Sequence, residues 1–151
     1  MRKANRQKPR KLKVVAIGPK RQKKQSLCNE LVVRMLDEPR QFDPGAQVEW
    51  LFRCFGFDDD DRLAKEIFKE LVRSSERGIR SADISSKCNV TQGAVVYHLN
   101  AFMRSGLVTK HGRFYHLRKP SLDATLSDLE EEVVRHFEKM RRLAMMLNEM
   151  F

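Results

Sequence analysis

The stretch from residue 81 to residue 105 constrains the fold most, because it reads as two helices with almost no chain between them. Ser81 is placed to cap the first helix, and Ile84 lies on its inward side. Asn89 stands at the sharp turn, where the backbone must be left-handed, a conformation that asparagine tolerates better than most residues. Thr91 can then cap the second helix with its hydroxyl. This spacing predicts a helix-turn-helix.

The second helix, residues 91 to 105, has two faces of different character. Val95, Leu99 and Phe102 recur at i, i+4 and i+7, which is the pattern of a stripe packed against a core. Gly106 can end the helix in a left-handed conformation. The opposite face contains no acidic residue. It consists of Gln92, Gly93, Val96, Tyr97, Asn100 and Arg104.

The residue types on this outward face suit DNA recognition. Side-chain amides of Gln and Asn bind adenine edges through two hydrogen bonds, valine can contact a thymine methyl group, and tyrosine can reach a phosphate or stack. Gly93 costs about 1 kcal/mol of helix stability relative to alanine, so we expect a close approach to the backbone there. The face is therefore predicted to enter a DNA major groove.

A β-hairpin is predicted directly after this helix, over residues 107–118. The chain alternates through Val108 to Lys110, turns at "HG", and returns through an aromatic, β-prone segment that begins at Phe114. A basic two-stranded wing beside a recognition helix can contact the DNA backbone or minor groove. Its basic side chains are Lys110, His111, Arg113, Arg118 and Lys119.

With "VYHL" in the second helix, then "GLV" and an aromatic wing strand, residues 62–120 resemble the winged helix-turn-helix of the arsenic-repressor (ArsR-like) superfamily, archaeal type. The resemblance covers 59 of the 151 residues. It implies a dimeric transcription regulator, with Gln92, Gly93, Val96, Tyr97 and Asn100 as the base-facing set. The paired-cysteine motif with which the family senses metals is absent, and only Cys88 stands there. We therefore expect no metal and no cofactor.

Two segments are expected before this domain. Residues 1–25 carry eleven Lys or Arg and no acid, so they are predicted to form a basic, largely disordered tail, in which "LKVVAI" could make a strand if something pairs with it. Residues 26–57 are predicted to form accessory helices. The first would begin at Ser26, end at Pro39 and carry Leu27, Leu31 and Met35 at four-residue spacing. The second, "VEWLFRCF", is apolar over much of its circumference and must be buried or shared with a partner.

The aspartate run 58–61 opens the predicted domain, which spans residues 58–120. A metal site is one interpretation of this run. The stronger interpretation is that carboxylates interact favourably with the N-terminus of the following helix, whose core stripe contains Leu63, Ile67 and Leu71.

A long helix is predicted over residues 121–151. At about 30 residues it would extend roughly 45 Å, and its apolar seam exceeds what a small domain can cover. We expect it to pair with a second copy, although it could instead fold back on "VEWLFRCF" of its own chain. Glu132 and His136 are spaced to hold a metal, but a surface hydrogen bond is the more economical interpretation. The dimerisation seam is Leu126, Leu129, Val133, Phe137, Met140, Ala144 and Leu147.

The net charge of +10 is unevenly distributed along the chain. Residues 1–25 contribute +11, residues 26–61 −6, residues 62–120 +8 and residues 121–151 −3. The excess inside the globular-looking segment favours nucleic acid as a partner. Cys28, Cys54 and Cys88 show neither disulfide nor zinc spacing, which favours reduced thiols. With neither a membrane span nor a signal peptide expected, the prediction is a soluble, intracellular protein. The resemblance to the ArsR-like superfamily implies a prokaryotic, cytoplasmic protein.

The sequence thus predicts a mainly α fold, α+β by virtue of the wing, with N-terminal accessory helices and a long C-terminal dimerisation helix. The predicted function is a sequence-specific, double-stranded DNA-binding transcription regulator that acts as a homodimer. It is not expected to be an enzyme, because motifs for phosphate cradling, nucleophilic attack and zinc hydrolysis are absent. The alternative is a winged-helix module that docks on the transcription or replication machinery through Trp50 and its neighbours. RNA binding through the basic tail is a third hypothesis.

Overall fold

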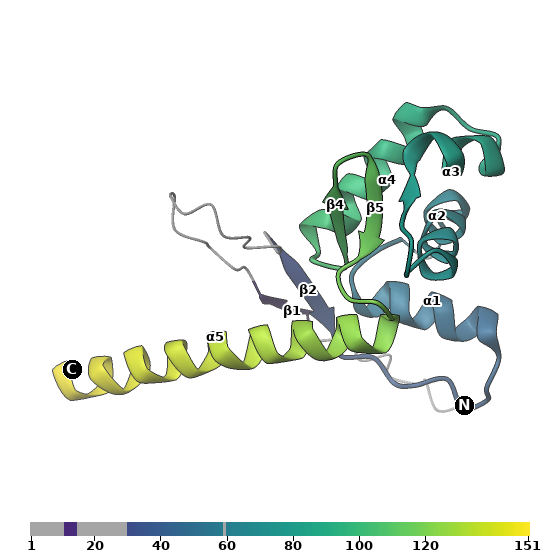
Figure 1. Ribbon diagram of the computed structural model, residues 1–151. Helices are drawn as coiled ribbons and strands as arrows, with labels where there is room; N and C mark the ends of the chain where they lie inside the picture. Colours follow the sequence, from purple (N-terminus) through teal and green to yellow (C-terminus); the bar gives the residue numbers. More distant parts are fainter. Residues whose placement is uncertain (1–10, 15–29, 59) are drawn as a thin grey trace, which may run out of the picture.

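The computed structural model of the 151-residue chain describes residues 11–14, 30–58 and 60–151. In these ranges the chain is mostly helical, with a small three-stranded antiparallel sheet and a separate two-stranded one (Figure 1). In chain order the elements are β1 (Lys11–Val14), β2 (Leu31–Arg34), α1 (Pro44–Cys54), α2 (Arg62–Arg73), β3 (Ile79–Arg80), α3 (Ser81–Cys88), α4 (Gln92–Arg104), β4 (Val108–His111), β5 (Phe114–Leu117) and α5 (Leu122–Met150).

The three-stranded sheet has the order β3-β5-β4. It joins a strand that precedes α3 and α4 to the two strands that follow them. Strands β4 and β5 form the predicted hairpin, with Val108 opposite Leu117 and His111 opposite Phe114. Gly112 has a φ of 61° at the first of the two turn positions, as a type II′ hairpin turn requires. Strand β3 pairs with the outer side of β5, so the chain before α3 is tied to the hairpin after α4.

One hydrophobic core unites α1, α2, α3, α4, the hairpin and the beginning of α5. The predicted stripe of α4, residues Val95, Leu99 and Phe102, is fully buried in it, which confirms the periodicity. Phe68 of α2 lies beside Phe102 with ring centroids 5.7 Å apart and is a core residue that the sequence pattern missed. The largest side chains of the core with almost no exposure are Phe52, Ile67, Leu71, Ile84, Leu99, Phe102 and Leu107.

The tight turn between α3 and α4 is built as predicted. Asn89 has φ 53° and ψ 49°, in the left-handed region. Thr91 caps α4, because its Oγ1 accepts a hydrogen bond of 3.2 Å from the Ala94 N–H. The prediction for Ser81 is wrong: it is the first residue of α3, and the capping position is occupied by Arg80, whose side chain binds Asp83 instead.

The helix predicted from Ser26 to Pro39 is wrong over residues 31–34. These form strand β2, which pairs antiparallel with β1, so the expectation of a strand within "LKVVAI" is confirmed for its first three residues, 12–14. The physical reason is local: Val32 and Val33 are β-branched and favour an extended backbone once a partner strand supplies hydrogen bonds. Residues 1–10 and 15–29, with the rest of the predicted tail and Cys28, lie outside the described residues.

Aspartates cap the two helices that flank the predicted acidic run. Asp43 accepts a hydrogen bond from the Ala46 N–H at the start of α1, and Asp61 accepts one of 2.9 Å from the Ala64 N–H at the start of α2. The helix-capping interpretation of the run is thus confirmed for Asp61. Phe52 of α1 is fully buried, and Trp50 is half-buried, as expected for a helix apolar on several sides.

Helix α5 has two halves with different surroundings. Leu129 is 3% exposed, and Leu122 and Leu126 pack against the core. From Phe137 onward every side chain is exposed, and Figure 1 shows this part projecting well beyond the rest of the molecule. No helix among the described residues combines the length and the apolar character that a membrane crossing demands.

Candidate nucleic-acid interface

The outward face of α4 is a continuous polar surface. Gln92, Val96, Asn100 and Arg104 follow one another at four-residue intervals, which places them on one side of the helix. All of them except the half-buried Val96 are exposed. Tyr97 is 70% exposed, which is a large aromatic surface for a side chain of a well-packed helix. Because α4 contains no acid, this face presents hydrogen-bonding groups without a negative charge of its own.

Gly93 has no role in the packing of the chain itself. A Cβ atom placed on it would meet nothing within 4 Å, and its φ is not positive. Neither steric crowding nor backbone conformation therefore requires glycine here, although glycine weakens a helix by about 1 kcal/mol. The vacant space lies outside the molecule, at the N-terminal turn of α4, where backbone N–H groups favour an approaching anion.

Gln92 is anchored to the beginning of α3. Its Nε2 donates a hydrogen bond of 2.9 Å to Oγ of Ser81, a residue that is itself buried. Sequence reasoning placed Gln92 in the site but missed Ser81 as its partner, since eleven residues separate them. The only sequence signal was a serine at the first turn of the preceding helix.

The tip of the hairpin presents basic and aromatic side chains. Lys110, His111 and Arg113 are exposed as predicted, and Arg113 makes no ion pair with any part of the chain that the structure describes. Lys110 Nζ lies 5.2 Å from the centroid of the Tyr115 ring. Phe114, which the sequence analysis did not include in the site, is 44% exposed beside the turn. The start of α4 and this hairpin tip lie toward the same end of the molecule, opposite α1 and α5 (Figure 1).

His116 of β5 packs against Gly78, in the loop that precedes β3. Its ring packs so closely over Gly78 that a Cβ there would lie 2.3 Å from His116 Cε1, and Gly78 has a φ of 74°. Burial, and secondarily the nearby His111, lower the pKa of His116 below its usual value. A neutral imidazole in this position supports the strand rather than adding charge to the surface.

Arg118 joins the end of the hairpin to α5 and is not part of the exposed wing surface. Its side chain is 7% exposed and binds two carboxylates of α5, Asp128 and, at 2.7 Å, Glu132. Burial alone would lower the pKa of the guanidinium, but the hydrogen bonds and charges of these carboxylates raise it. Glu132 is therefore engaged by Arg118, and the surface hydrogen bond expected between Glu132 and His136 is not formed among the described residues. The prediction that Arg118 decorates the wing is wrong, because α5 covers it.

Most basic residues of the helical face formed by α2 and α3 are neutralised locally. Lys65 pairs with Glu49 at 3.1 Å, and Lys69 pairs with Glu66 at 2.8 Å. Glu70 accepts from both Lys87 and Arg73, and the hydrogen bond from Lys87 is the main reason that the pKa of Glu70 is lowered. The +8 charge of residues 62–120 is thus not spread evenly, and the exposed hairpin residues Lys110 and Arg113 pair with no carboxylate of the part of the chain that the structure describes.

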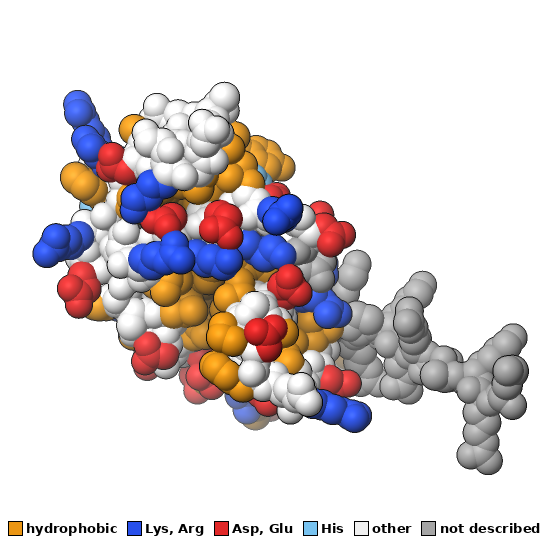
Figure 2. Space-filling model, turned by 90° about the vertical axis from the view of Figure 1, so that its right-hand side faces the viewer, with side chains coloured by type: hydrophobic (Ala, Val, Ile, Leu, Met, Phe, Trp, Pro, Cys, Tyr) orange, Lys and Arg blue, Asp and Glu red, His pale blue; other side chains and the backbone are white. Residues whose placement is uncertain are grey.

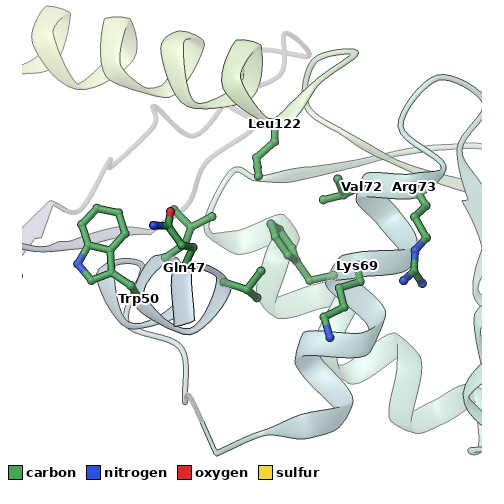
Figure 3. A pocket seen from close by; sticks show the side chains of 9 residues that line it. Gln47, Trp50, Lys69, Val72, Arg73 and Leu122 are labelled. Carbon is green, nitrogen blue, oxygen red and sulfur yellow. The ribbon is translucent and has the colours of Figure 1, made fainter. Parts of the chain in front are cut away.

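An apolar groove opens between α1, α2 and the first residue of α5. It has a volume of about 410 Å³, and Val48, Leu51, Phe68, Val72 and Leu122 line it (Figure 3). Trp50, Gln47, Lys69 and Arg73 complete the lining. On the face drawn in Figure 2, a row of Lys and Arg side chains runs across the molecule, with hydrophobic side chains exposed directly below it. The helix "VEWLFRCF" is therefore only partly covered within one chain.

Within the described ranges, no three His, Cys, Asp or Glu side chains come together to form a metal site. Cys54 and Cys88 are half-buried free thiols, and burial raises the pKa of each. A thiol with a raised pKa is a poor nucleophile at neutral pH.

Comparison of the chain with known proteins found no matching protein family, curated protein or solved structure.

Proposed function

We propose that this protein is a sequence-specific DNA-binding transcription regulator that acts as a homodimer, in the cytoplasm of a prokaryotic cell. In this proposal residues 58–120 form a winged helix-turn-helix domain, α4 enters the major groove, and the β4–β5 hairpin contacts the backbone or minor groove. The observation that carries it is the outward face of α4, which is exposed, free of acids, and contains a glycine that nothing inside the molecule requires.

The order of the elements supports the assignment. A helix, a short strand, two helices joined by a tight turn, and a hairpin that pairs with the short strand follow one another from α2 to β5. In such an arrangement the second of the two joined helices, α4, keeps one side in the core, and its other side is available to a groove of DNA. The predicted basic tail would add phosphate contacts, and it lies outside the described residues.

The proposed homodimer rests on the second half of α5. Phe137, Met140, Ala144 and Leu147 are exposed there, and Met140 and Leu147 keep about half of their surface in water. The first part of the predicted seam serves another purpose, since Leu126 and Leu129 pack within their own chain. Two copies joined through the distal half would read two half-sites related by two-fold symmetry.

Selection of bound sequences from a random double-stranded DNA library, with full-length protein at about physiological salt, tests the function. We expect a two-fold palindromic motif. The double variant Gln92→Ala/Asn100→Ala should lose the motif, whereas the control Gln41→Ala, which removes an exposed amide outside α4, should keep it. Binding that merely follows the charge of the protein, with no enriched sequence, would overturn the proposal.

The apolar groove favours a second candidate function, docking on a protein of the transcription or replication machinery. A helix from a partner could insert into a groove of this kind, lined by Val48, Leu51 and Leu122. The two functions give different results with the same variants. A docking module would retain whatever affinity it has for DNA when Tyr97 or Asn100 is replaced by alanine, but a regulator would lose its sequence preference.

A further inference from the structure

We propose that the distal half of α5, residues 137–150, pairs antiparallel with the same segment of a second copy, so that the two winged domains of the proposed regulator lie at opposite ends of the pair. The inference rests on the proposed homodimer and goes one step further, because it assigns the direction of the pairing and the residues that face each other. The observation that carries it is one side of α5 that its own domain covers in the first half and leaves bare in the second.

The same side of α5 runs through both halves of the helix. Residues 18 apart are about five full turns apart, so they lie on the same side of an α-helix, separated by about 27 Å. Three apolar residues that pack in the core from the first half are followed at this interval by exposed residues of the dimerisation seam. The pairs are Leu122 and Met140, Leu126 and Ala144, and Leu129 and Leu147. The seam of the second half therefore continues the side on which the first half packs against its own chain.

This continuity excludes a parallel pair in register. Two packed helices lie about 8–10 Å apart, so a parallel partner seated on the distal seam would continue along the same side of α5 past Leu129. Leu129 is buried against the domain of its own chain, and Arg118 binds Asp128 and Glu132 beside it. That space is therefore occupied. An antiparallel partner enters from the projecting end of α5 instead and overlaps the second half alone (Figure 1).

The residues that flank the distal seam favour the same direction. Leu143 and Met150 lie on one flank, Arg141 and Asn148 lie on the other, and all four are exposed. In an antiparallel pair the two-fold axis is perpendicular to the helices and brings each flank onto itself, whereas in a parallel pair unlike flanks meet. Antiparallel pairing therefore buries Leu143 of one copy against Leu143 of the other. Parallel pairing would place Leu143 beside the polar side chain of Asn148.

The pairing determines how far apart the two domains lie. When Met140 of one copy faces Leu147 of the other, the centre of the overlap lies beside Ala144, whose small side chain allows the helices to approach closely. At 1.5 Å per residue, Leu122 of one copy then lies about 65 Å along the helix axis from Leu122 of the other. Half-sites separated by about two turns of DNA, at roughly 34–36 Å per turn, fit this span.

Distances between spin labels on the full chain test the direction. Cys28, Cys54 and Cys88 are replaced by alanine, and this background must sediment as wild type does. A single cysteine is then introduced as Ser127→Cys or, as the matched control, Arg142→Cys, both at exposed positions of α5. The two labels at position 127 should lie roughly 50 Å apart in an antiparallel dimer but only about 20 Å apart in a parallel one. The control labels, near the centre of the overlap, should lie about 20 Å apart in either arrangement.

A second experiment tests the contact between the two Leu143 side chains without labels. Leu143→Glu and Leu143→Lys should each weaken dimerisation by at least about tenfold, because like charges then face each other across the two-fold axis. An equal mixture of the two variants should form dimer more readily than either variant alone, since opposite charges meet in the mixed dimer. Met145→Glu and Met145→Lys are the control pair, exposed and outside the seam, and should dimerise as wild type does, alone or mixed. Analytical ultracentrifugation measures each sample.

The outcomes separate this inference from the homodimer on which it rests. A dimer whose labels at position 127 lie about 20 Å apart overturns the antiparallel pairing and leaves the homodimer intact. A mixture of the two Leu143 variants that dimerises no better than either variant alone also overturns the antiparallel pairing. A wild-type protein that sediments as a monomer overturns the proposed homodimer instead.

Discussion

Helix α4 leaves one side uncovered and the distal half of α5 leaves its whole circumference uncovered, but the surfaces that they expose are different. The open side of α4 is polar, contains no acid and includes Gly93, which has space above it. Distal α5 exposes large apolar side chains, with Leu143 and Met150 60% and 71% exposed. Water solvates the first surface well, so this surface can remain exposed in the free protein until a ligand binds. Exposed apolar surface of the second kind is stabilised by burial, and in the proposed homodimer a second copy of the chain buries it.

The largest predicted effect concerns the open side of α5. The double variant Met140→Glu/Leu147→Glu should convert the proposed dimer into a folded monomer, because both side chains are exposed in one copy and charges in a dimer interface are costly. Affinity for a two-fold DNA site should fall by about hundredfold, since the second half-site contact becomes independent. Analytical ultracentrifugation and binding measurements report the two losses.

Met145→Glu is the control for this experiment, because Met145 is 64% exposed but lies outside the predicted seam. It should leave the dimer intact. A wild-type protein that sediments as a monomer at micromolar concentration would contradict the assignment of distal α5 as the dimer surface.

The next effect concerns Arg118, which joins the hairpin beside α4 to the covered half of α5. Replacing it with methionine should lower the free energy of unfolding by about 1–3 kcal/mol, less than for a fully buried pair because Asp128 and Glu132 remain partly hydrated. Arg113→Met, at the exposed hairpin tip, should change it by less than about 0.5 kcal/mol. Chemical denaturation measures both free energies of unfolding. Equal values for the two variants would show that the ion pairs of Arg118 do not stabilise the fold.

The same ion pairs predict a pH dependence. Burial alone would raise the pKa of Asp128, but the hydrogen bond and charge of Arg118 lower it overall. The unfolded carboxyl titrates near pH 3.9, so below about pH 4 the unfolded state binds the proton more readily and stability is lost as pH falls through the lower folded pKa. Denaturation curves between about pH 5 and pH 2 should show a shallower loss for Arg118→Met than for wild type.

Sequence reasoning succeeded where local pattern determines structure. The buried stripe of α4, the left-handed Asn89 and the cap at Thr91 each depend on residues within one or two turns, and all were predicted. It failed where a distant segment decides. Leu27, Leu31 and Met35 have helical spacing, but pairing with β1 makes Leu31–Arg34 a strand. Likewise Ser81 meets Gln92 and Arg118 meets α5 only through tertiary contacts, which no local pattern encodes.

A smaller effect tests whether the space above Gly93 is functional. Gly93→Ala should raise the free energy of unfolding by about 0.5–1 kcal/mol, since the new Cβ meets nothing and alanine favours the helix. Affinity for the selected DNA should nevertheless fall by about tenfold, the size of one lost base contact, because the methyl group occupies the space of the partner. Thermal unfolding and fluorescence anisotropy give the two values.

Ser127→Ala, an exposed change to alanine in α5, is the control for added helix propensity and should leave affinity unaltered. A stabilised Gly93→Ala protein with full affinity would contradict the view that DNA approaches this turn.

The smallest effect separates the hairpin from α4. Arg113→Ala should weaken binding to selected and unrelated DNA by the same factor, because a phosphate contact carries no sequence information. The slope of log K against log salt should decrease by about 0.9 for the one lost contact. Arg77→Ala, an exposed arginine between α2 and β3 that makes no ion pair with the described residues, is the matched control and should preserve the slope. A loss of affinity confined to the selected sequence would instead indicate that Arg113 contacts a base. The assignment of base contacts to α4 and phosphate contacts to the hairpin would then be wrong.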